Sequence, residues 1–349
     1  MAGRFGYEID GYRFAPEEFL PERICDRIVE VRVSRPDLIK KAAQSRRRRR
    51  TLTRDGKLTI LATDHPARMV TRVGDDPVAI GDRYGLLARL ARVLTDPRFD
   101  GVMATPDIVE ELLVLDYLLQ EAGGPSFLDE KVILGCMNRG GLAGVSFEMD
   151  DRMTAYTACA IKEMGLDGAK LMFRLDPENP DSGKTIWYCV EAINELVDME
   201  IPVFLEALMM QKADGKYKTL KQVEALMKVV SVASGLGKSS AYTWLKIPYC
   251  GGYEKVARAT TCPILMLGGE STGYPTGILE EFAAGMRAGA TVRGALVGRN
   301  VTFPGNDDPR AVAVAVSEIV HRGLDAGAAT EVLMDTRGKD MGALTRYLG

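Results

Sequence analysis

Histidine is nearly absent from this 349-residue sequence, which contains only His65 and His321. A zinc site with several imidazole ligands therefore cannot be assembled, which argues against a metal-dependent aldolase or amidohydrolase, and we expect no metal. A G-x-S-x-G element is also missing, so nothing supports a serine nucleophile of the hydrolase type. The phosphate loop of nucleotide-binding proteins is absent as well. The nearest candidate is GLGKSS at 235 to 240. The phosphate loop also requires a glycine five residues before Gly237, and that position is Val232.

The sequence also lacks long apolar runs and paired cysteines. No run approaches 18 uninterrupted apolar residues, and the N-terminus has no signal-peptide core. The six cysteines form no C-x-x-C pair and lie mostly in apolar stretches, as reduced thiols do. The formal net charge is only −3, which argues against a polyanion-binding protein. We therefore expect a soluble, cytoplasmic protein that binds neither membrane nor nucleic acid.

Eight short apolar runs alternate with longer amphipathic segments. Each run is rich in Val, Ile, Leu or Met and stops at Gly, Pro, Asp or Asn, as strands buried on both faces do. The runs lie at 57 to 66, 100 to 107, 131 to 141, 166 to 177, 201 to 209, 242 to 252, 262 to 272 and 293 to 300. Eight strand and helix units over roughly 250 residues predict a (β/α)8 TIM barrel, an α/β fold. A doubly wound sheet is the alternative.

The predicted barrel spans residues 57–322. Residues 1–56 are expected to form an N-terminal helical extension that includes five consecutive arginines, Arg46 to Arg50. Residues 323–349 are predicted to be a C-terminal tail rich in Gly and Ala. In an acidic protein an isolated arginine run is typical of a solvated or partner-contacting segment rather than of a nucleic-acid site.

Two lysines interrupt apolar strands, which makes them the leading candidates for chemistry. Lys170 falls in the fourth strand and Lys246 in the sixth, and alternate strands of a barrel contribute to the same interior layer. Burial and a nearby cation lower the pKa of an amine, which favours a neutral nucleophile that can form a Schiff base. Glu206 in the fifth strand and Asp64 after the first could move protons. The alternatives are that such a lysine reaches solvent and that Asp64 is only a turn residue.

The seventh and eighth strands end in a pattern that favours phosphate binding. LGGEST supplies Gly268, Gly269 and Ser271, and GRN supplies Gly298 and Arg299. The loops after these two strands commonly hold phosphate in barrels. The alternative is that the glycines only make tight turns. His65 and Arg139, which follow the first and third strands, complete the set of candidate substrate-binding residues.

The strands GAKLMFRLDP, IPVFLEALM, YTWLKIPY and CPILMLGGEST resemble those of the class I tagatose-bisphosphate aldolase family. The similarity to archaeal-type class I fructose-bisphosphate aldolases and to sulfofructosephosphate aldolases is looser. The whole chain resembles still more an actinobacterial barrel family that is found with inositol-degradation genes and is often labelled deoxyribose-phosphate aldolase-like.

This resemblance implies a Schiff-base aldolase that needs no metal or organic cofactor. It places the imine-forming lysine at Lys246, the second lysine at Lys170, the glutamate at Glu206 and the aspartate at Asp64. It also implies a substrate, 5-dehydro-2-deoxygluconate 6-phosphate, cleaved to dihydroxyacetone phosphate and malonate semialdehyde. Arg139 or Arg68 could then hold the substrate carboxylate.

Other functions stay open at this point. The enzyme could act on deoxyribose phosphate or on a ketose bisphosphate such as tagatose or fructose bisphosphate. The barrel could also be a non-catalytic protein that binds a sugar phosphate and regulates a partner through the arginine run. The expected ligand is in each case a phosphorylated sugar, and the exposed helix faces leave room for a homo-oligomer.

Overall fold

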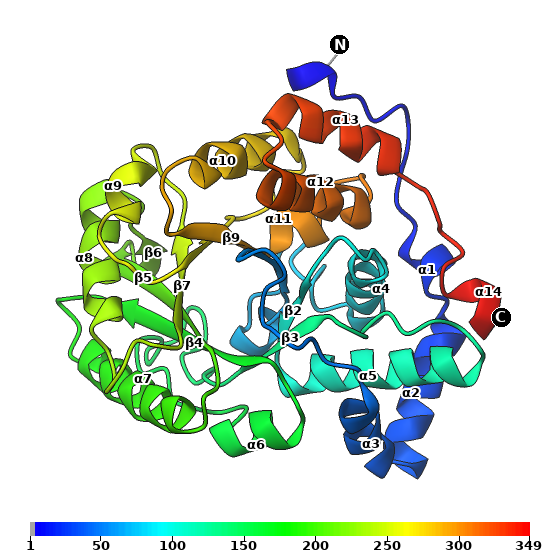
Figure 1. The fold of residues 1–349 in the computed structure, drawn as a ribbon, viewed down its shortest axis with the longest axis horizontal. Helices are drawn as coiled ribbons and strands as arrows, with labels where there is room; N and C mark the ends of the chain where they lie inside the picture. Colours follow the sequence, from blue (N-terminus) through cyan, green and yellow to red (C-terminus); the bar gives the residue numbers. More distant parts are fainter. Residues whose placement is uncertain (1–3) are drawn as a thin grey trace.

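The computed structural model describes residues 4–349, and its centre is a closed ring of parallel strands (Figure 1). The eight strands of this ring are β1 (Leu58–Ala62), β2 (Gly101–Ala104), β3 (Val132–Cys136), β4 (Gly168–Leu175), β5 (Val203–Ala213), β7 (Thr243–Pro248), β8 (Ile264–Leu267) and β9 (Val292–Val297). Each pairs with the next in parallel, and β1 pairs with β9 to close the ring. The predicted (β/α)8 barrel is confirmed.

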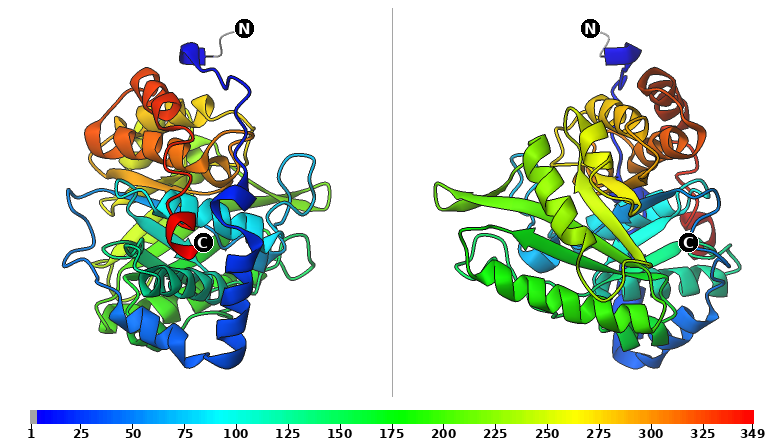
Figure 2. Two further views of the ribbon diagram at one scale, coloured as in Figure 1. Left: turned by 90° about the vertical axis from the view of Figure 1, so that its right-hand side faces the viewer. Right: turned by 60° about the vertical axis from the view of Figure 1, so that its left-hand side comes forward.

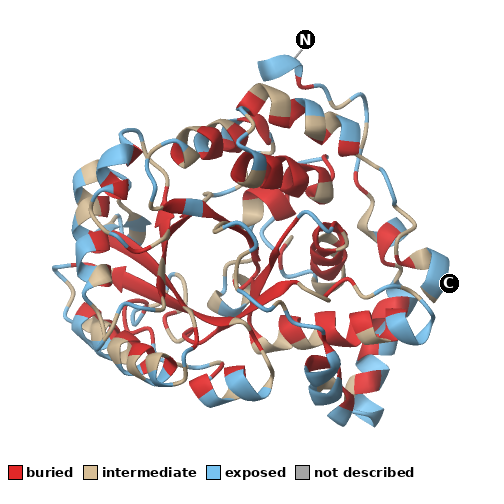
Figure 3. Cartoon of the chain, in the orientation of Figure 1, coloured by how far each residue is buried: buried red, intermediate tan, exposed pale blue. Residues whose placement is uncertain are grey.

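Helices follow the strands and cover the outside of the ring. They are α4 (Arg83–Leu94), α5 (Pro106–Glu121), α6 (Ala158–Glu163), α7 (Asp181–Asp198), α8 (Val223–Ser234), α9 (Tyr253–Ala257), α10 (Thr276–Met286), α11 (Arg299–Thr302) and α12 (Pro309–Arg322). Figure 3 shows buried residues on the faces of these helices that point toward the strands, with exposed residues on the opposite faces. This distribution is that of amphipathic helices on a closed sheet. No helix within residues 4–349 combines the length and apolar character needed to span a bilayer.

The alternation of side chains along each strand creates two cores. On β5, Val203, Leu205 and Ala207 pack in the core between strands and helices, whereas Phe204 belongs to the core inside the barrel. Successive side chains of a strand point to opposite faces. Glu206 therefore shares the interior face with Phe204, and the apolar strand carries its carboxylate into the barrel.

The two ends of the chain add helices to the outside of the barrel. The N-terminal part forms α1 (Pro16–Phe19), α2 (Glu22–Ser34) and α3 (Asp37–Ser45), and the C-terminal part forms α13 (Ala326–Thr336) and α14 (Thr345–Leu348). The first and last segments run side by side in Figures 1 and 2. Tyr7 donates a hydrogen bond to Asp307, and Arg337 donates one to the carbonyl of Glu8. The expected tail after residue 323 is therefore largely helical and packed.

The arginine run is neither a solvated nor a partner-contacting segment as a whole, which corrects the expectation from sequence. Arg46 and Arg49 are buried at the amino-terminal ends of the strands, where they pair with Asp167 at 2.9 Å and Asp100 at 2.7 Å. Arg48 also contacts Asp167, at 3.0 Å. Buried charges need partners, and these carboxylates lie directly before β4 and β2. The run thus attaches the N-terminal extension to the base of the barrel.

Candidate active site

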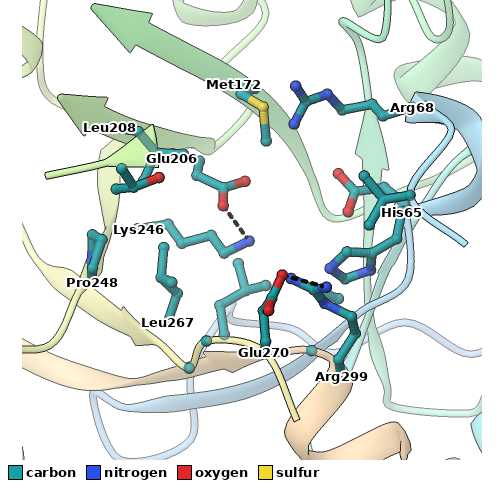
Figure 4. A pocket seen from close by; sticks show the side chains of 18 of the residues that line it. His65, Arg68, Met172, Glu206, Leu208, Lys246, Pro248, Leu267, Glu270 and Arg299 are labelled. Carbon is teal, nitrogen blue, oxygen red and sulfur yellow. Dashed lines mark hydrogen bonds and ion pairs between the residues drawn. The ribbon is translucent and has the colours of Figure 1, made fainter. Parts of the chain in front are cut away.

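A cavity of about 430 Å³ opens at the carboxyl ends of the strands (Figure 4). This is the end at which barrel enzymes place their active sites. Most of the candidate residues named from sequence line it: Asp64, His65, Arg139, Glu206, Lys246, Gly268, Gly269, Gly298 and Arg299. The structure thus brings together residues from six strand ends, although their roles remain predictions.

Glu206 lies between the two strand lysines. Lys246 Nζ is 2.9 Å from Glu206 Oε1, and Lys170 Nζ is 2.6 Å from Glu206 Oε2. Figure 4 shows the Lys246 side chain reaching from β7 across the cavity toward Glu206. Lys170 is fully buried and is not among the residues that line the cavity. Of the two amines, only that of Lys246 is therefore placed to meet a ligand.

The environment of these groups shifts their pKa values in a consistent way. Burial lowers the pKa of Lys246 to about 8; Glu206 opposes this shift and Lys170 adds to it. Burial and then the Arg139 guanidinium lower the pKa of Lys170. Burial alone would raise the pKa of Glu206, but the two ammonium groups outweigh it and hold that pKa well below its usual range. Glu206 is therefore a carboxylate at neutral pH, and about a tenth of Lys246 is a neutral amine at pH 7.

Lys170 also connects Glu206 to a second set of charged side chains, formed by Asp64 and Arg139. Asp64 Oδ2 accepts a hydrogen bond from Lys170 Nζ at 2.9 Å and from the Cys136 thiol at 3.1 Å, and it is in direct contact with Arg139. Arg139 is buried, and its Nε has no hydrogen-bond partner within residues 4–349. Three cations (Lys170, Lys246 and Arg139) therefore contact two carboxylates (Asp64 and Glu206). This surplus of positive charge favours a neutral amine or an anionic ligand.

His65 is a neutral side chain beside the cavity. Burial, followed by the nearby Arg299 and Lys246, lowers the pKa of His65 to about 3. A side chain at Gly298 would begin 3.1 Å from His65 Cε1, so glycine leaves room for the ring. His65 can thus exchange hydrogen bonds with a ligand at neutral pH without carrying charge.

The Gly268–Gly269 pair is fixed by close neighbours. A Cβ at Gly268 would collide with the side-chain amide of Asn300, and one at Gly269 would come 3.4 Å from Lys221 Nζ. Arg299 and Lys221 both line the cavity, and Arg299 pairs with Glu270, which directly follows Gly269. Two cations therefore flank the glycines, which is an arrangement suited to an anion.

Ser271 lines a neighbouring cavity with Glu270 and Arg299, and its role in substrate binding stays a prediction. Its hydroxyl donates to the Phe303 carbonyl and accepts from the amide of Gly273, and it does not line the main cavity. The hydroxyl is therefore used within the loop.

Sequence reasoning missed the hairpin that forms one wall of the cavity. β5 continues beyond the barrel and pairs with antiparallel β6 (Lys216–Thr219), and Figure 2 shows this hairpin extending from the body. Tyr217, Lys218, Thr219 and Lys221 come from it or just after it. The turn is made by Asp214 and Gly215, with φ of +52° and +75°. An Asp-Gly pair between strand formers is a hairpin signal, and it could have predicted this wall.

The profile of one protein family, described as Cgl0159-like, matches residues 56–319. The chain belongs to the Cgl0159-like family. Its sequence is 35% identical to that of Cgl0159 from Corynebacterium glutamicum, for which a crystal structure is known. The two structures match with a TM-score of 0.80 over 87% of this chain and 98% of that one.

Two other similarities are more distant. The uncharacterized aldolase SSO3226 of Saccharolobus solfataricus is 30% identical over 142 residues, which are 40% of this chain and 48% of that protein. The chain thus spans about half the length of this curated relative. An archaeal fructose 1,6-bisphosphate aldolase is 21% identical over 82% of this chain and all of that one, with a TM-score of 0.55. At this identity the likeness shows the fold alone. The finer resemblance to tagatose-bisphosphate aldolases or to inositol-linked proteins stays a prediction.

Proposed function

We propose that this member of the Cgl0159-like family is a class I aldolase that cleaves a phosphorylated keto sugar through a Schiff base on Lys246. The observation that carries the proposal is the position of Lys246. Its amine lines the cavity at the carboxyl ends of the strands, has a pKa lowered to about 8, and lies 2.9 Å from the Glu206 carboxylate. A lysine of this kind is a nucleophile for ketones near neutral pH.

A lowered pKa alone does not make such a site, as Lys131 illustrates. Burial lowers the pKa of Lys131 to about 7, but its ammonium donates to the carbonyls of Asp96 and Phe99 at the other end of the barrel. Lys131 does not line the main cavity. Access to the main cavity and a direct ion pair with Glu206 therefore distinguish Lys246.

The proposed reaction begins when the neutral amine attacks the ketone carbon, and loss of water gives a protonated imine. The bond between the carbon next to the imine and the hydroxyl-bearing carbon then breaks. Its electron pair moves into the iminium to form an enamine, while the hydroxyl proton passes to a carboxylate and the aldehyde leaves. Protonation of the enamine and hydrolysis of the imine release the second product.

Two carboxylates could carry the protons, and the proposal leaves both open. Glu206 contacts Lys246 directly, whereas Asp64 lines the cavity next to Arg139. Lys170 holds both carboxylates, at 2.6 Å and 2.9 Å. We assign Lys170 the role of lowering the pKa of Lys246 and keeping the carboxylates in position.

We further propose that the substrate is 5-dehydro-2-deoxygluconate 6-phosphate, which would give dihydroxyacetone phosphate and malonate semialdehyde. The cations Arg299 and Lys221 beside Gly268 and Gly269 support a phosphate at one side of the cavity. The unpartnered Nε of buried Arg139 supports a carboxylate elsewhere in it. Deoxyribose phosphate and the ketose bisphosphates, which lack a carboxylate, are the alternatives.

The alternative of a non-catalytic barrel that binds a sugar phosphate and regulates a partner has lost its main support. It assigned partner contact to the arginine run, but Arg46 and Arg49 are buried in ion pairs within the chain. No other feature of residues 4–349 favours it over catalysis.

Borohydride trapping with dihydroxyacetone phosphate tests the chemistry. We expect an irreversible mass increase on the peptide that carries Lys246, no increase in Lys246→Met, and an unchanged increase in Lys131→Met. Lys131 is the matched control because it is also buried with a lowered pKa. If neither dihydroxyacetone phosphate nor a panel of phosphorylated ketoses and aldehydes gives an adduct on Lys246, the proposal fails.

A further inference from the structure

The side of the cavity that carries Arg299 also carries a carboxylate, that of Glu270. Glu270 Oε1 lies 3.1 Å from Arg299 Nη1, with the Glu270 side chain 82% exposed and that of Arg299 19% exposed. Figure 4 shows this ion pair at the edge of the cavity that contains Lys246. Arg299 Nε has no hydrogen-bond partner within the described chain. Within residues 4–349 the one carboxylate that pairs with Arg299 thus comes from an exposed side chain, and part of the guanidinium has no partner.

The ion pair also separates two spaces. Glu270, Arg299 and Val70 line both the main cavity and an outer cavity of about 600 Å³. Arg72 and Lys216 line the outer cavity but not the main one. If Glu270 leaves Arg299, the outer cavity therefore offers its carboxylate two other cations, Arg72 and Lys216.

From this arrangement we infer that Glu270 is a built-in competitor for the phosphate group and so lowers the affinity of the cavity for phosphorylated ligands. The inference rests on the proposed function in assuming a phosphorylated substrate. In the ligand-free protein the Glu270 carboxylate occupies Arg299, and a phosphate must displace it. A guanidinium binds phosphate with two parallel hydrogen bonds, which a single exposed contact to a carboxylate does not match.

The competition has a small and defined effect. An exposed ion pair contributes little, so its loss should cost the ligand only about two- to fivefold in affinity. A phosphorylated ligand recovers this cost through Arg299. A ligand with a neutral end makes no bond to Arg299, so it has no need to displace the carboxylate. Glu270 therefore reduces the affinity advantage of phosphorylated over unphosphorylated ligands by about the same two- to fivefold.

The test compares Glu270→Gln with a matched control, Glu178→Gln. Glu178 is also exposed, follows β4 at the same end of the barrel, and makes no ion pair within residues 4–349. Both variants change the net charge equally. Binding of inorganic phosphate is measured by calorimetry at constant ionic strength for the wild type and both variants. We expect the Kd for phosphate to fall by about two- to fivefold in Glu270→Gln and to stay unchanged in Glu178→Gln.

Three results would overturn the inference. An equal change in both variants would show a general charge effect. A weaker affinity in Glu270→Gln would show that Glu270 orients Arg299 for binding instead of competing. If none of the three proteins binds phosphate, the proposed phosphate site does not exist.

The inference and the proposed function can fail separately. Phosphate binding needs no turnover, whereas the Schiff base is read by trapping on Lys246. If the phosphate contrast appears but no adduct forms, the competition stands and the aldolase proposal falls. If the adduct forms but the variants bind phosphate alike, Glu270 has no such role.

Discussion

Lys246 Nζ lies 2.9 Å from Glu206 Oε1, and the other oxygen of the same carboxylate lies 2.6 Å from Lys170 Nζ. One buried carboxylate is thus shared between a lysine that lines the cavity and a lysine that does not. The arrangement keeps a negative charge beside the proposed nucleophile and a second positive charge behind it. The titration of Lys246 therefore reports on the whole group.

Formation of the Lys246 adduct should depend on pH with a midpoint near 8. The pKa of Lys246 is lowered to about 8, so the reactive neutral amine accumulates as the pH rises through that value. The initial rate of trapping, measured between pH 7 and 10, should rise and then level off. The substrate phosphate is already almost fully ionised in this range and adds little slope of its own. A rate that is flat from pH 7 to 9 would contradict the assignment.

Replacing either neighbour of Lys246 should move this midpoint, and in opposite directions. Glu206 raises the pKa of Lys246 and Lys170 lowers it. Lys170→Met should therefore shift the midpoint of adduct formation to higher pH, and Glu206→Gln should shift it to lower pH. Trapping rates over the same pH range measure both. Shifts of the same sign would show that the two residues act through structure rather than charge.

Arg139 should discriminate between substrates with and without a carboxylate. Hydrogen bonds to charged groups contribute about 1.5 to 3 kcal/mol, so Arg139→Met should lower kcat/KM for the keto acid phosphate by roughly 10- to 100-fold more than for a ketose bisphosphate. Arg152→Met is the control, because Arg152 is 65% exposed and pairs only with Asp150. Equal losses for both substrates would mean that Arg139 only holds Asp64. Faster turnover of the bisphosphates by the wild type would count against the keto acid.

The buried and exposed members of the arginine run should differ in their effect on stability. Arg49→Ala leaves Asp100 buried without its guanidinium, and breaking a buried ion pair typically costs 3 to 5 kcal/mol. We expect a loss of about 3 kcal/mol, since Thr59 and His321 still contact Asp100. Arg47 is 69% exposed, so Arg47→Ala should change the free energy of unfolding by less than about 1 kcal/mol. Urea denaturation of both variants decides this, and equal losses would argue against an anchoring role.

The sequence alone was sufficient for the architecture. Runs that end at Gly, Pro, Asp or Asn marked all eight barrel strands, because strand formation and side-chain alternation are local properties. The sequence also singled out Lys246, Lys170 and Glu206 within these strands, but it left open whether the lysines point into the barrel or reach solvent. Lys246 interrupts an apolar strand because it lines a cavity, where a buried amine can meet a ligand.

Only the tertiary structure determined which of these charges meet. Lys170 pairs with Phe204 on the next strand, and Phe204 pairs with Trp244 on the one after it. Lys246 therefore lies two residues beyond the position that is level with Lys170. A barrel staggers its strands, and this stagger brings both lysines to the same carboxylate.

The burial of Arg46 and Arg49 likewise depends on carboxylates about 50 to 120 residues away in the sequence. The position of Ser271 outside the cavity and the approach of Lys221 to Gly269 follow from loop and hairpin paths. Local patterns thus specified the strands. Closure of the barrel specified the contacts, since ion pairs between distant residues form only once the strands are fixed in register.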